Sequence, residues 1–298
     1  MLHRHFSRKG RRLLALAALG VGLLVAGCGP QYVVLHPVGP VGRQELSLME
    51  FAAIAMAAVI LIVFVLFGTA VVRFRDYKGN KNPYRPDFHD HRLLETLWII
   101  VPAVILAIIA VPTVKTTYAL AKLPAHTDPV TIDVTSLDWK WLFQYPNQKV
   151  ATVNYAVIPT GKPVLFELTA DSPMNTFWVP QLGGMEYTMP GRVLPLWLQA
   201  NKAGVYWGHS GQFSGVGFEK MFFHVKAVTP TAFQRWASHT HATAAPMTMA
   251  DYHRLLHFTV VGKQTYASYP KDTFPSVTHG FSLSGGMYLL ARNNPNRG

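Results

Sequence analysis

Two long apolar segments, separated by a short basic one, constrain the fold of this chain more than any other feature. No charged residue interrupts Phe51 to Val72 or Thr96 to Val114, and a helix needs about 20 mainly apolar residues to span a membrane. The segment between them, from Arg73 to Arg92, is rich in Lys and Arg, which are enriched in cytoplasmic loops. The sequence therefore predicts a membrane hairpin of two helices over 51–127, with a cytoplasmic loop and both ends outside.

The N-terminal segment predicts a lipoprotein leader. Residues 1–27 contain basic residues followed by an apolar run from Leu13 to Val25, as in a secretory signal, and the residues just before Cys28 resemble a bacterial lipobox. We expect cleavage before Cys28 and a lipid on its thiol, which would add a second anchor. The alternative is an uncleaved anchor with an incidental cysteine. Residues 28–50, with Pro, Gly and polar residues from Gln31 to Leu48, are predicted to form an extended exterior tether.

The composition agrees with a membrane protein that carries one further domain. Of 298 residues, 50% are hydrophobic and 14% charged. The net charge of +12 does not predict nucleic-acid binding, because the basic clusters flank apolar segments and are explained by topology. The single cysteine excludes a disulfide framework and a thiolate-bridged metal pair within the chain.

Beyond the hairpin, the pattern changes to short strand-like runs separated by turn residues. We expect strands over Val130–Ser136, Lys140–Tyr145, Ala151–Ile158, Val164–Ala170, Phe177–Pro180, Val193–Ala200 and Met221–Val228. This spacing predicts an all-β Greek-key sandwich over 128–228. Residues 229–298 are expected to form a C-terminal arm, with helices starting near Pro230 and at Thr248 and a capping box to Asp251. From Gly262 to Gly298 we expect an irregular, loose tail.

The segments 171–180 and 206–221 have the arrangement of a metal loop without its ligands. A binuclear copper centre in such a sandwich uses two thiolates four residues apart, an imidazole, a thioether and a second imidazole from a distant strand, all ligands that suit copper. The corresponding positions hold Ser210, Ser214, Phe218, Met221 and Asn175. Because methionine alone is retained, we expect no metal in this chain.

Together with Asp138 to Pro146 and Met189-Pro-Gly, these segments resemble subunit II of the haem-copper respiratory oxidases. The resemblance is to the quinol-oxidising branch of the cytochrome bo3 type, which lacks this copper centre. It implies a cupredoxin-like domain in a complex that oxidises membrane quinol, reduces dioxygen to water and pumps protons. It also implies no catalytic residue or cofactor in this chain, haem and copper in subunit I, and contacts with subunits I and III and membrane lipid. The expected location is the bacterial cytoplasmic membrane, with the β-domain on the outer, periplasmic side.

The same resemblance suggests roles for three further residues. Glu95-Thr-Leu-Trp98 is similar to the family segment whose carboxylate lies at the mouth of a proton channel in subunit I, so Glu95 is a candidate for proton entry. The alternative is that Glu95 only complements the helix dipole. Trp139 and Trp141 are expected to alternate along a strand and to pack against a neighbouring subunit.

Two other classes of protein remain as alternatives. A copper-bearing cytochrome c oxidase subunit has the same expected fold, but serine cannot supply the bridging thiolate. A stand-alone lipoprotein that binds or ferries copper would use the imidazoles and thioethers of the C-terminal half, namely His224, His239, His241, Met247, Met249, His253 and His257. Their spacing is irregular, and an exposed polar face explains His253 and His257 better than a shared metal does.

Overall fold

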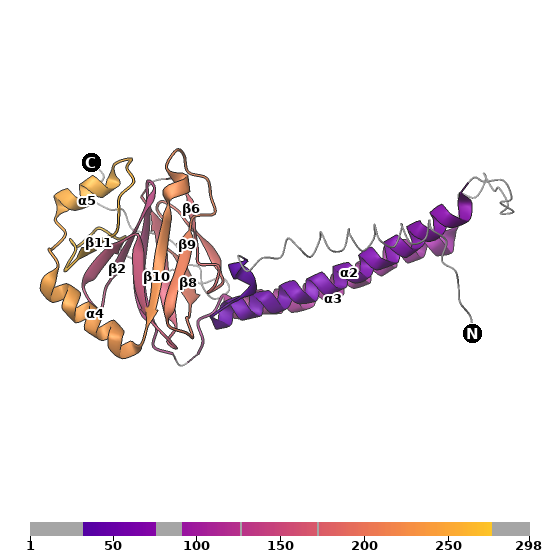
Figure 1. Cartoon of the computed structure of the whole chain (residues 1–298), viewed down its shortest axis with the longest axis horizontal. Helices are drawn as coiled ribbons and strands as arrows, with labels where there is room; N and C mark the ends of the chain where they lie inside the picture. Colours follow the sequence, from indigo (N-terminus) through magenta and orange to yellow (C-terminus); the bar gives the residue numbers. More distant parts are fainter. Residues whose placement is uncertain (1–31, 76–90, 126, 172, 276–298) are drawn as a thin grey trace, which may run out of the picture.

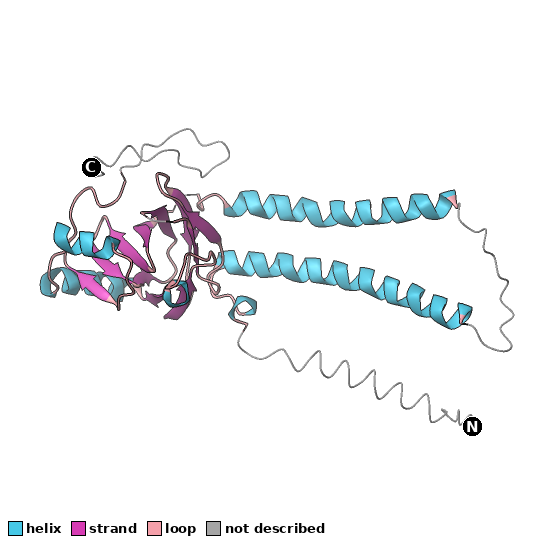
Figure 2. Ribbon diagram, turned by 90° about the horizontal axis from the view of Figure 1, so that it is seen from above, coloured by secondary structure: helices cyan, strands magenta, loops and turns pink. Residues whose placement is uncertain are grey.

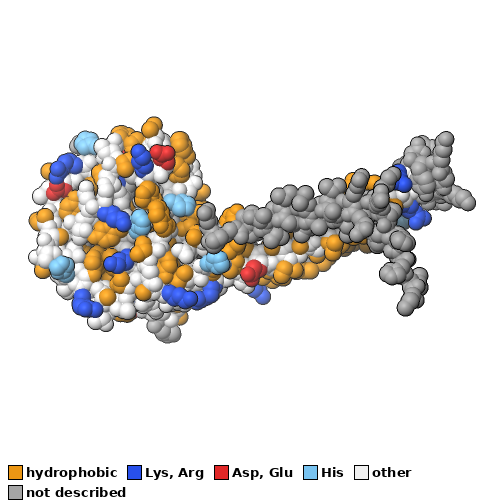
Figure 3. Space-filling view, in the orientation of Figure 1, with side chains coloured by type: hydrophobic (Ala, Val, Ile, Leu, Met, Phe, Trp, Pro, Cys, Tyr) orange, Lys and Arg blue, Asp and Glu red, His pale blue; other side chains and the backbone are white. Residues whose placement is uncertain are grey.

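Two long helices extend side by side from one side of a β-domain in the computed structural model (Figures 1 and 2). The structure describes residues 32–75, 91–125, 127–171 and 173–275. A short 3-10 helix, η1 (Val33–Leu35), precedes α2 (Pro40–Phe74), and α3 (Arg92–Leu120) returns to the domain. The mean hydropathy of the most apolar part is 2.9 in α2 and 2.6 in α3, and neither part is buried within the chain. Figure 3 shows hydrophobic side chains along the visible part of these helices. The helices are therefore long and apolar enough to cross a membrane.

The prediction of an extended tether over 28–50 is wrong from Pro40 onward, because α2 begins there. Proline is favoured at the first position of a helix, where its missing N–H is not needed and its φ is already helical. The glycines and prolines that indicated a tether lie before the helix or within its first turn, and the residues that follow are good helix formers. Cys28 and the leader lie outside the described residues.

The domain is a β-sandwich, as predicted. Within the described residues its strands are β1 (Val130–Leu137), β2 (Lys140–Tyr145), β3 (Val150–Val153), β4 (Tyr155–Pro159), β5 (Val164–Ala170), β6 (Asn175–Trp178), β7 (Met185–Thr188), β8 (Leu194–Leu198), β9 (Gly204–His209), β10 (Phe222–Val228) and β11 (Gln264–Tyr266). One sheet has the order β11-β3-β2-β1-β5-β8 and the other β4-β10-β9-β6-β7. Most neighbours are antiparallel, but β1 pairs with β5, and β4 with β10, in parallel.

Aromatic rings fill the space between the two sheets. Phe177 stacks on Phe223 with ring centroids 4.8 Å apart, and Trp141 and Phe143 contact both rings. Aromatic side chains bury a large apolar area each, and tilted or edge-on contacts between them add to the stability. The alternation of residues along the strands places these rings inside the sandwich.

Several predicted strands have different bounds. The expected strand Ala151–Ile158 divides at Asn154, whose φ of 60° ends β3 and redirects the chain into β4 of the other sheet. Asparagine tolerates this left-handed conformation better than most residues. Strands β7 and β9 were not expected, because glycines and polar residues obscured their short alternating patterns.

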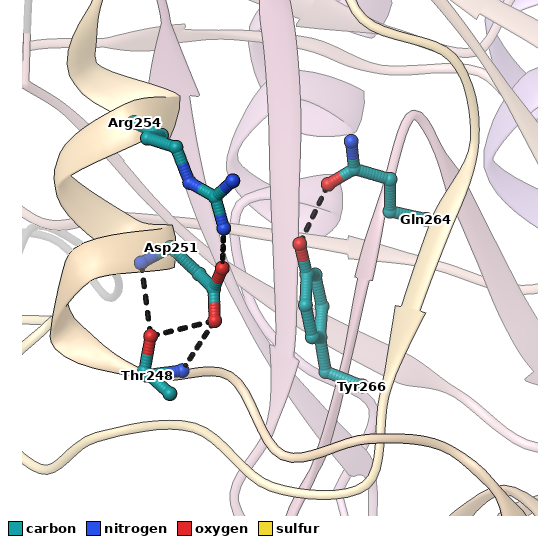
Figure 4. Close-up of polar contacts among 5 residues, drawn as sticks. All are labelled: Thr248, Asp251, Arg254, Gln264 and Tyr266. Carbon is teal, nitrogen blue, oxygen red and sulfur yellow. Dashed lines mark hydrogen bonds and ion pairs between the residues drawn. The ribbon is translucent and has the colours of Figure 1, made fainter.

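The C-terminal arm is more ordered than predicted. The segment after Gly262 was expected to be irregular, but it contains the strand β11 (Gln264–Tyr266). Helices α4 (Pro230–Thr243) and α5 (Met249–Leu256) follow the last strand of the sandwich, and β11 then pairs with β3. The predicted capping box is present: Asp251 N–H donates to Thr248 Oγ1, and Thr248 N–H donates to the Asp251 carboxylate at 2.8 Å (Figure 4). Arg254 also pairs with Asp251, and Tyr266 donates to Gln264 on β11. Residues 276–298 lie outside the described part of the chain.

Candidate functional site

Asn175 and Ser210, two of the residues predicted to stand at copper-ligand positions, hydrogen-bond to each other. Asn175 begins β6 and Ser210 follows β9, and pairing between Trp178 and His209 holds these strands together. The Ser210 hydroxyl donates to Asn175 Oδ1 at 3.1 Å and accepts from the backbone N–H of Thr176 at 3.4 Å. Both side chains are buried, so this polar pair is satisfied inside the domain.

The remaining positions lie in the loop that follows. Ser214 Oγ lies 3.9 Å from the sulfur of Met221, and Phe218, in the short helix η2 (Phe218–Lys220), packs edge-on against Phe213 at 5.6 Å. The backbone N–H of Ser210 donates to the carbonyl of Met221 at 3.4 Å, which joins the two pairs. The structure therefore brings the predicted positions together at one end of the sandwich.

This donor set does not fit a binuclear copper centre. Bridging two copper ions needs thiolates, and the terminal ligands are imidazoles, whereas these side chains offer two hydroxyls, an amide, a phenyl ring and one thioether. Across the part of the chain that the structure describes, no three His, Cys, Asp or Glu side chains gather as a metal site would require. The loop is closed by its own hydrogen bonds and ring contacts.

The predicted alternation of Trp139 and Trp141 along a strand is wrong. Trp139 lies in the two-residue turn between β1 and β2 with a φ of 61°. Its indole N–H donates to the carbonyl of Ser214 at 3.0 Å, and the ring packs so closely on Gly217 that a side chain there would overlap it. Trp139 thus anchors the loop that contains Ser214 and Gly217.

Trp141 is 0% exposed and belongs to the aromatic core. The prediction that it contacts another subunit is therefore wrong, since no surface of it reaches a partner. Two rings that do face outward are Trp207 and Phe222, which lie 5.2 Å apart on the outer face of the sheet containing β9 and β10. The alternation of Val205 and Trp207 within β9 was the signal that could have found them.

Lys140 is buried beneath the C-terminal arm and was not recognised from the sequence. Its ammonium group donates to the carbonyls of Asp138, Leu255 and His257 at 2.8 to 2.9 Å. Burial lowers the pKa of Lys140 to about 8, and the nearby Asp138 carboxylate opposes that shift. Because Leu255 and His257 lie at the end of α5, Lys140 attaches the arm to the sandwich.

The helix hairpin and the β-domain meet through backbone contacts at residues 38–45 and 181–184, which we call the junction. Val38 N–H donates to Gln181 O at 2.7 Å, and Gly42 N–H donates to Leu182 O at 3.0 Å. Gly184 N–H donates to the Glu45 carboxylate at 2.8 Å.

The second helix is fixed separately, because the indole N–H of Trp197 donates to the carbonyl of Leu120 at 2.7 Å. Both helices are thus attached to the domain.

Glu95 lies in the first turn of α3, at the end of the helix away from the β-domain, and its side chain is half-buried. The cap of this helix is His91, whose Nδ1 accepts from the backbone N–H of Leu94 at 3.3 Å. The position agrees with the predicted boundary of the membrane segment. It fits either proton entry or complementing the helix dipole.

The histidines and methionines of the C-terminal half are spread over separate elements. His224 lies on β10 against Trp207 at 4.6 Å, His241 on α4 contacts the carbonyl of Ala267, and Met247 is buried in the small core under the arm. Burial, with a smaller effect of Lys263, lowers the pKa of His224. The described structure does not bring this group together as a copper site.

Comparison with protein families matches two models in succession. Residues 39–116 match "Cytochrome C oxidase subunit II, transmembrane domain", and residues 126–228 match "Cytochrome C oxidase subunit II, periplasmic domain". These ranges correspond to the helix hairpin and the sandwich. They leave the C-terminal arm outside the matched region.

Curated relatives extend over most of the chain. It is 42% identical to quinol oxidase subunit 2 of Bacillus cereus over 261 residues, which cover 87% of this chain and 90% of that one. It is 39% identical to quinol oxidase subunit 2 of Bacillus subtilis over 260 residues, covering 86% and 81%. Among solved structures, the periplasmic domain of subunit II of cytochrome oxidase of Bradyrhizobium japonicum matches with a TM-score of 0.36 and 22% identity, covering 37% of this chain and 91% of that one.

Proposed function

The chain belongs to the quinol oxidase subunit 2 family, and from this premise we propose that it is the non-redox subunit II of a proton-pumping terminal quinol oxidase. Such a complex oxidises membrane quinol and reduces dioxygen to water, with haem and copper in subunit I. The observation that carries the non-redox role is the closed loop of Asn175, Ser210, Ser214 and Met221, whose donors do not fit a binuclear copper centre. The subunit would anchor and complete the complex through contacts with subunits I and III.

Copper loading tests this role. The full chain purified in detergent, incubated with copper and then desalted, is expected to show no intense visible thiolate-to-copper band, because hydroxyls replace both bridging thiolates. A purple binuclear subunit II serves as the positive control. A stoichiometric band of that kind in this protein would contradict the proposed role.

We further propose an orientation in a bacterial cytoplasmic membrane. The chain is a membrane protein with two spanning helices and a C-terminal domain of the type found on the outer side. The basic segment between the helices supports a cytoplasmic loop, and a lipid on Cys28 would lie on the same outer side as the β-domain.

Glu95 is proposed to collect protons for the channel of subunit I. Glu95→Gln and Glu95→Ala are expected to reduce quinol-dependent oxygen uptake severalfold while haem content and assembly stay normal, because a lost collector slows delivery without altering the haem site. Glu95→Asp, which keeps the charge, should be milder. Oxygen-electrode rates on haem-normalised complex measure the effect.

The matched control is Glu50→Gln, which removes an exposed carboxylate from α2 near its β-domain end. Its turnover is expected to equal that of the wild type. If Glu95 only complements the helix dipole, an effect of about 0.3–1 kcal/mol, Glu95→Gln will also turn over normally and the proton-entry role will be lost.

A further inference from the structure

We propose that a cavity between β10 and the C-terminal arm binds a small carboxylate that has an apolar body. The cavity has a volume of about 210 Å³, and its lining includes Lys220, Phe222, His224, Val260, Val261 and Lys263. None of the residues at the predicted copper-ligand positions lines it, and the site does not depend on the function proposed above.

Strand β10 forms the floor of this cavity. Phe223 and Val225 belong to the core of the sandwich, so the alternating residues Phe222 and His224 point outward. Their rings lie 6.0 Å apart. The segment 260–263, which leads from α5 to β11, forms the wall beside them. Two parts of the chain that are distant in sequence therefore enclose the space.

Asn154 holds the floor and the wall together. Its side-chain amide nitrogen donates to the carbonyl of Val261 at 2.7 Å, and its backbone carbonyl accepts from the N–H of His224 at 3.2 Å. Its Oδ1 accepts from the backbone N–H of Trp141 at 2.9 Å, which fixes the side chain. The cavity is therefore built into the fold, as sites for small molecules usually are.

Positive charge lies at the edge of the cavity. Lys220 and Lys263 both line it and are exposed, and no acidic residue of the described structure lines it. Glu219 lies 4.0 Å from Lys220, whereas Lys263 takes part in none of the ion pairs of the described residues. One neighbouring carboxylate does not balance two ammonium groups, so the edge favours an anion.

His224 adds a hydrogen-bond donor to these charges. Burial, and then the nearby charge of Lys263, lower the pKa of His224, so its imidazole is neutral at pH 7. A neutral imidazole carries one N–H. Nδ1 is buried without a hydrogen-bond partner in the described structure, whereas Nε2 is not buried in this way. Nε2 is therefore the ring nitrogen that a ligand can reach.

The walls of the cavity indicate the rest of the ligand. Phe222, Val260 and Val261 are apolar, and burying an apolar body against them is favourable. The volume is below the about 300–1,000 Å³ of sites for drug-sized ligands, so a single ring or a short branched chain is the appropriate size. Phosphate, with three acceptor oxygens and a charge of about −1.5 to −2, would place polar oxygens against these walls. A carboxylate, with two oxygens and one charge, fits better.

The test compares an acid with its uncharged amide on the full chain in a non-ionic detergent. Cyclohexanecarboxylate is expected to bind with a dissociation constant of about 1 mM, because a ligand of this size gains limited affinity per atom. Cyclohexanecarboxamide has the same shape without the charge and should bind about tenfold more weakly. Saturation-transfer NMR measures both, and the unfolding temperature with and without acid gives a second readout.

Charge-removing variants connect this binding to the cavity. Lys220→Gln and Lys263→Gln should each weaken binding of the acid severalfold, and the double variant should bind acid and amide alike. The matched control is Lys202→Gln, which removes an exposed lysine outside the cavity and should bind the acid as the wild type does. Because these lysines are exposed, all variants should unfold at the wild-type temperature when no ligand is present.

Three results would overturn the proposal. Equal binding of acid and amide to the wild type would mean that apolar contact alone explains the binding. An equal loss of acid binding in Lys202→Gln and Lys263→Gln would point to the net charge of the protein and not to the cavity. Displacement of the acid by inorganic phosphate at a lower concentration than the acid itself needs would assign the cavity to a different anion.

Discussion

Gly183→Ala is expected to detach the β-domain from the helix hairpin and to lower the yield of assembled, active complex severalfold. Gly183 has a φ of 90°, and a Cβ atom there would lie 2.6 Å from the Cα of Gly42 in the first turn of α2. The clash would push apart the two backbone segments that are joined by the hydrogen bond from Gly42 N–H to Leu182 O. Left-handed backbone costs about 1–2 kcal/mol for alanine, and overpacking adds about 1–3 kcal/mol.

The matched control is Gly161→Ala. Gly161 has a φ of 72°, so alanine meets a similar backbone penalty, but nothing lies within 4 Å of the added Cβ. Thermal unfolding of the full chain and quinol-dependent oxygen uptake of membranes compare the two variants. If both variants lost stability and oxygen uptake to the same extent, the backbone conformation alone would explain the effect, and the junction contact would not contribute.

Lys140→Met, a change on β2, should destabilise the C-terminal arm. Methionine fills a similar volume but leaves the carbonyls of Asp138, Leu255 and His257 without their donor. A buried acceptor left unsatisfied costs about 1–3 kcal/mol, so we expect a loss of about 3 kcal/mol and faster proteolysis between Thr243 and Tyr266. Thermal unfolding and limited proteolysis measure these effects.

The pH dependence of stability distinguishes the effect of the Lys140 ammonium group from the effect of its packing. The pKa of Lys140 is about 8 in the folded protein, below its ordinary value of 10.5, so the unfolded chain binds more protons between these values. Stability due to this group therefore rises as the pH increases from 8 to 10.5. Lys140→Met should lack that rise, and Lys226→Met, at an exposed position on β10, should keep it. If stability changed with pH in the same way in the wild type, Lys140→Met and Lys226→Met, the role of Lys140 would be contradicted.

Features that depend on local sequence could be predicted. Long uncharged runs specify membrane helices because lipid leaves few other structures available. Short alternating runs with turn residues indicated most of the sandwich, and the Thr248–Asp251 capping box depends on three-residue spacing alone. The assignment of residues to copper-ligand positions stays a prediction, and it rests on spacing within one loop, which the sequence shows directly.

Features that depend on the pairing of distant strands could not be predicted. Asn154 looks like one residue of a continuous strand, and its left-handed backbone is set by the need to join two sheets. Trp141 was assigned to the surface because aromatic runs pack equally well inside and outside a sheet. Leu255 and His257, two of the three acceptors of Lys140, follow it by more than 100 residues, and the position of Asp133 opposite Gln144 and Glu167 exists only in the final register.

The attachment of both α2 and α3 to the β-domain has a consequence for assembly. A domain joined by one flexible linker must lose rotational freedom when it docks on a partner, and this entropy loss opposes binding. Here hydrogen bonds at Gly42 and Trp197 already restrict the domain relative to the helices. Once the hairpin is inserted in the membrane, the domain meets its partners with its orientation largely preset, so more of the contact energy is available for affinity.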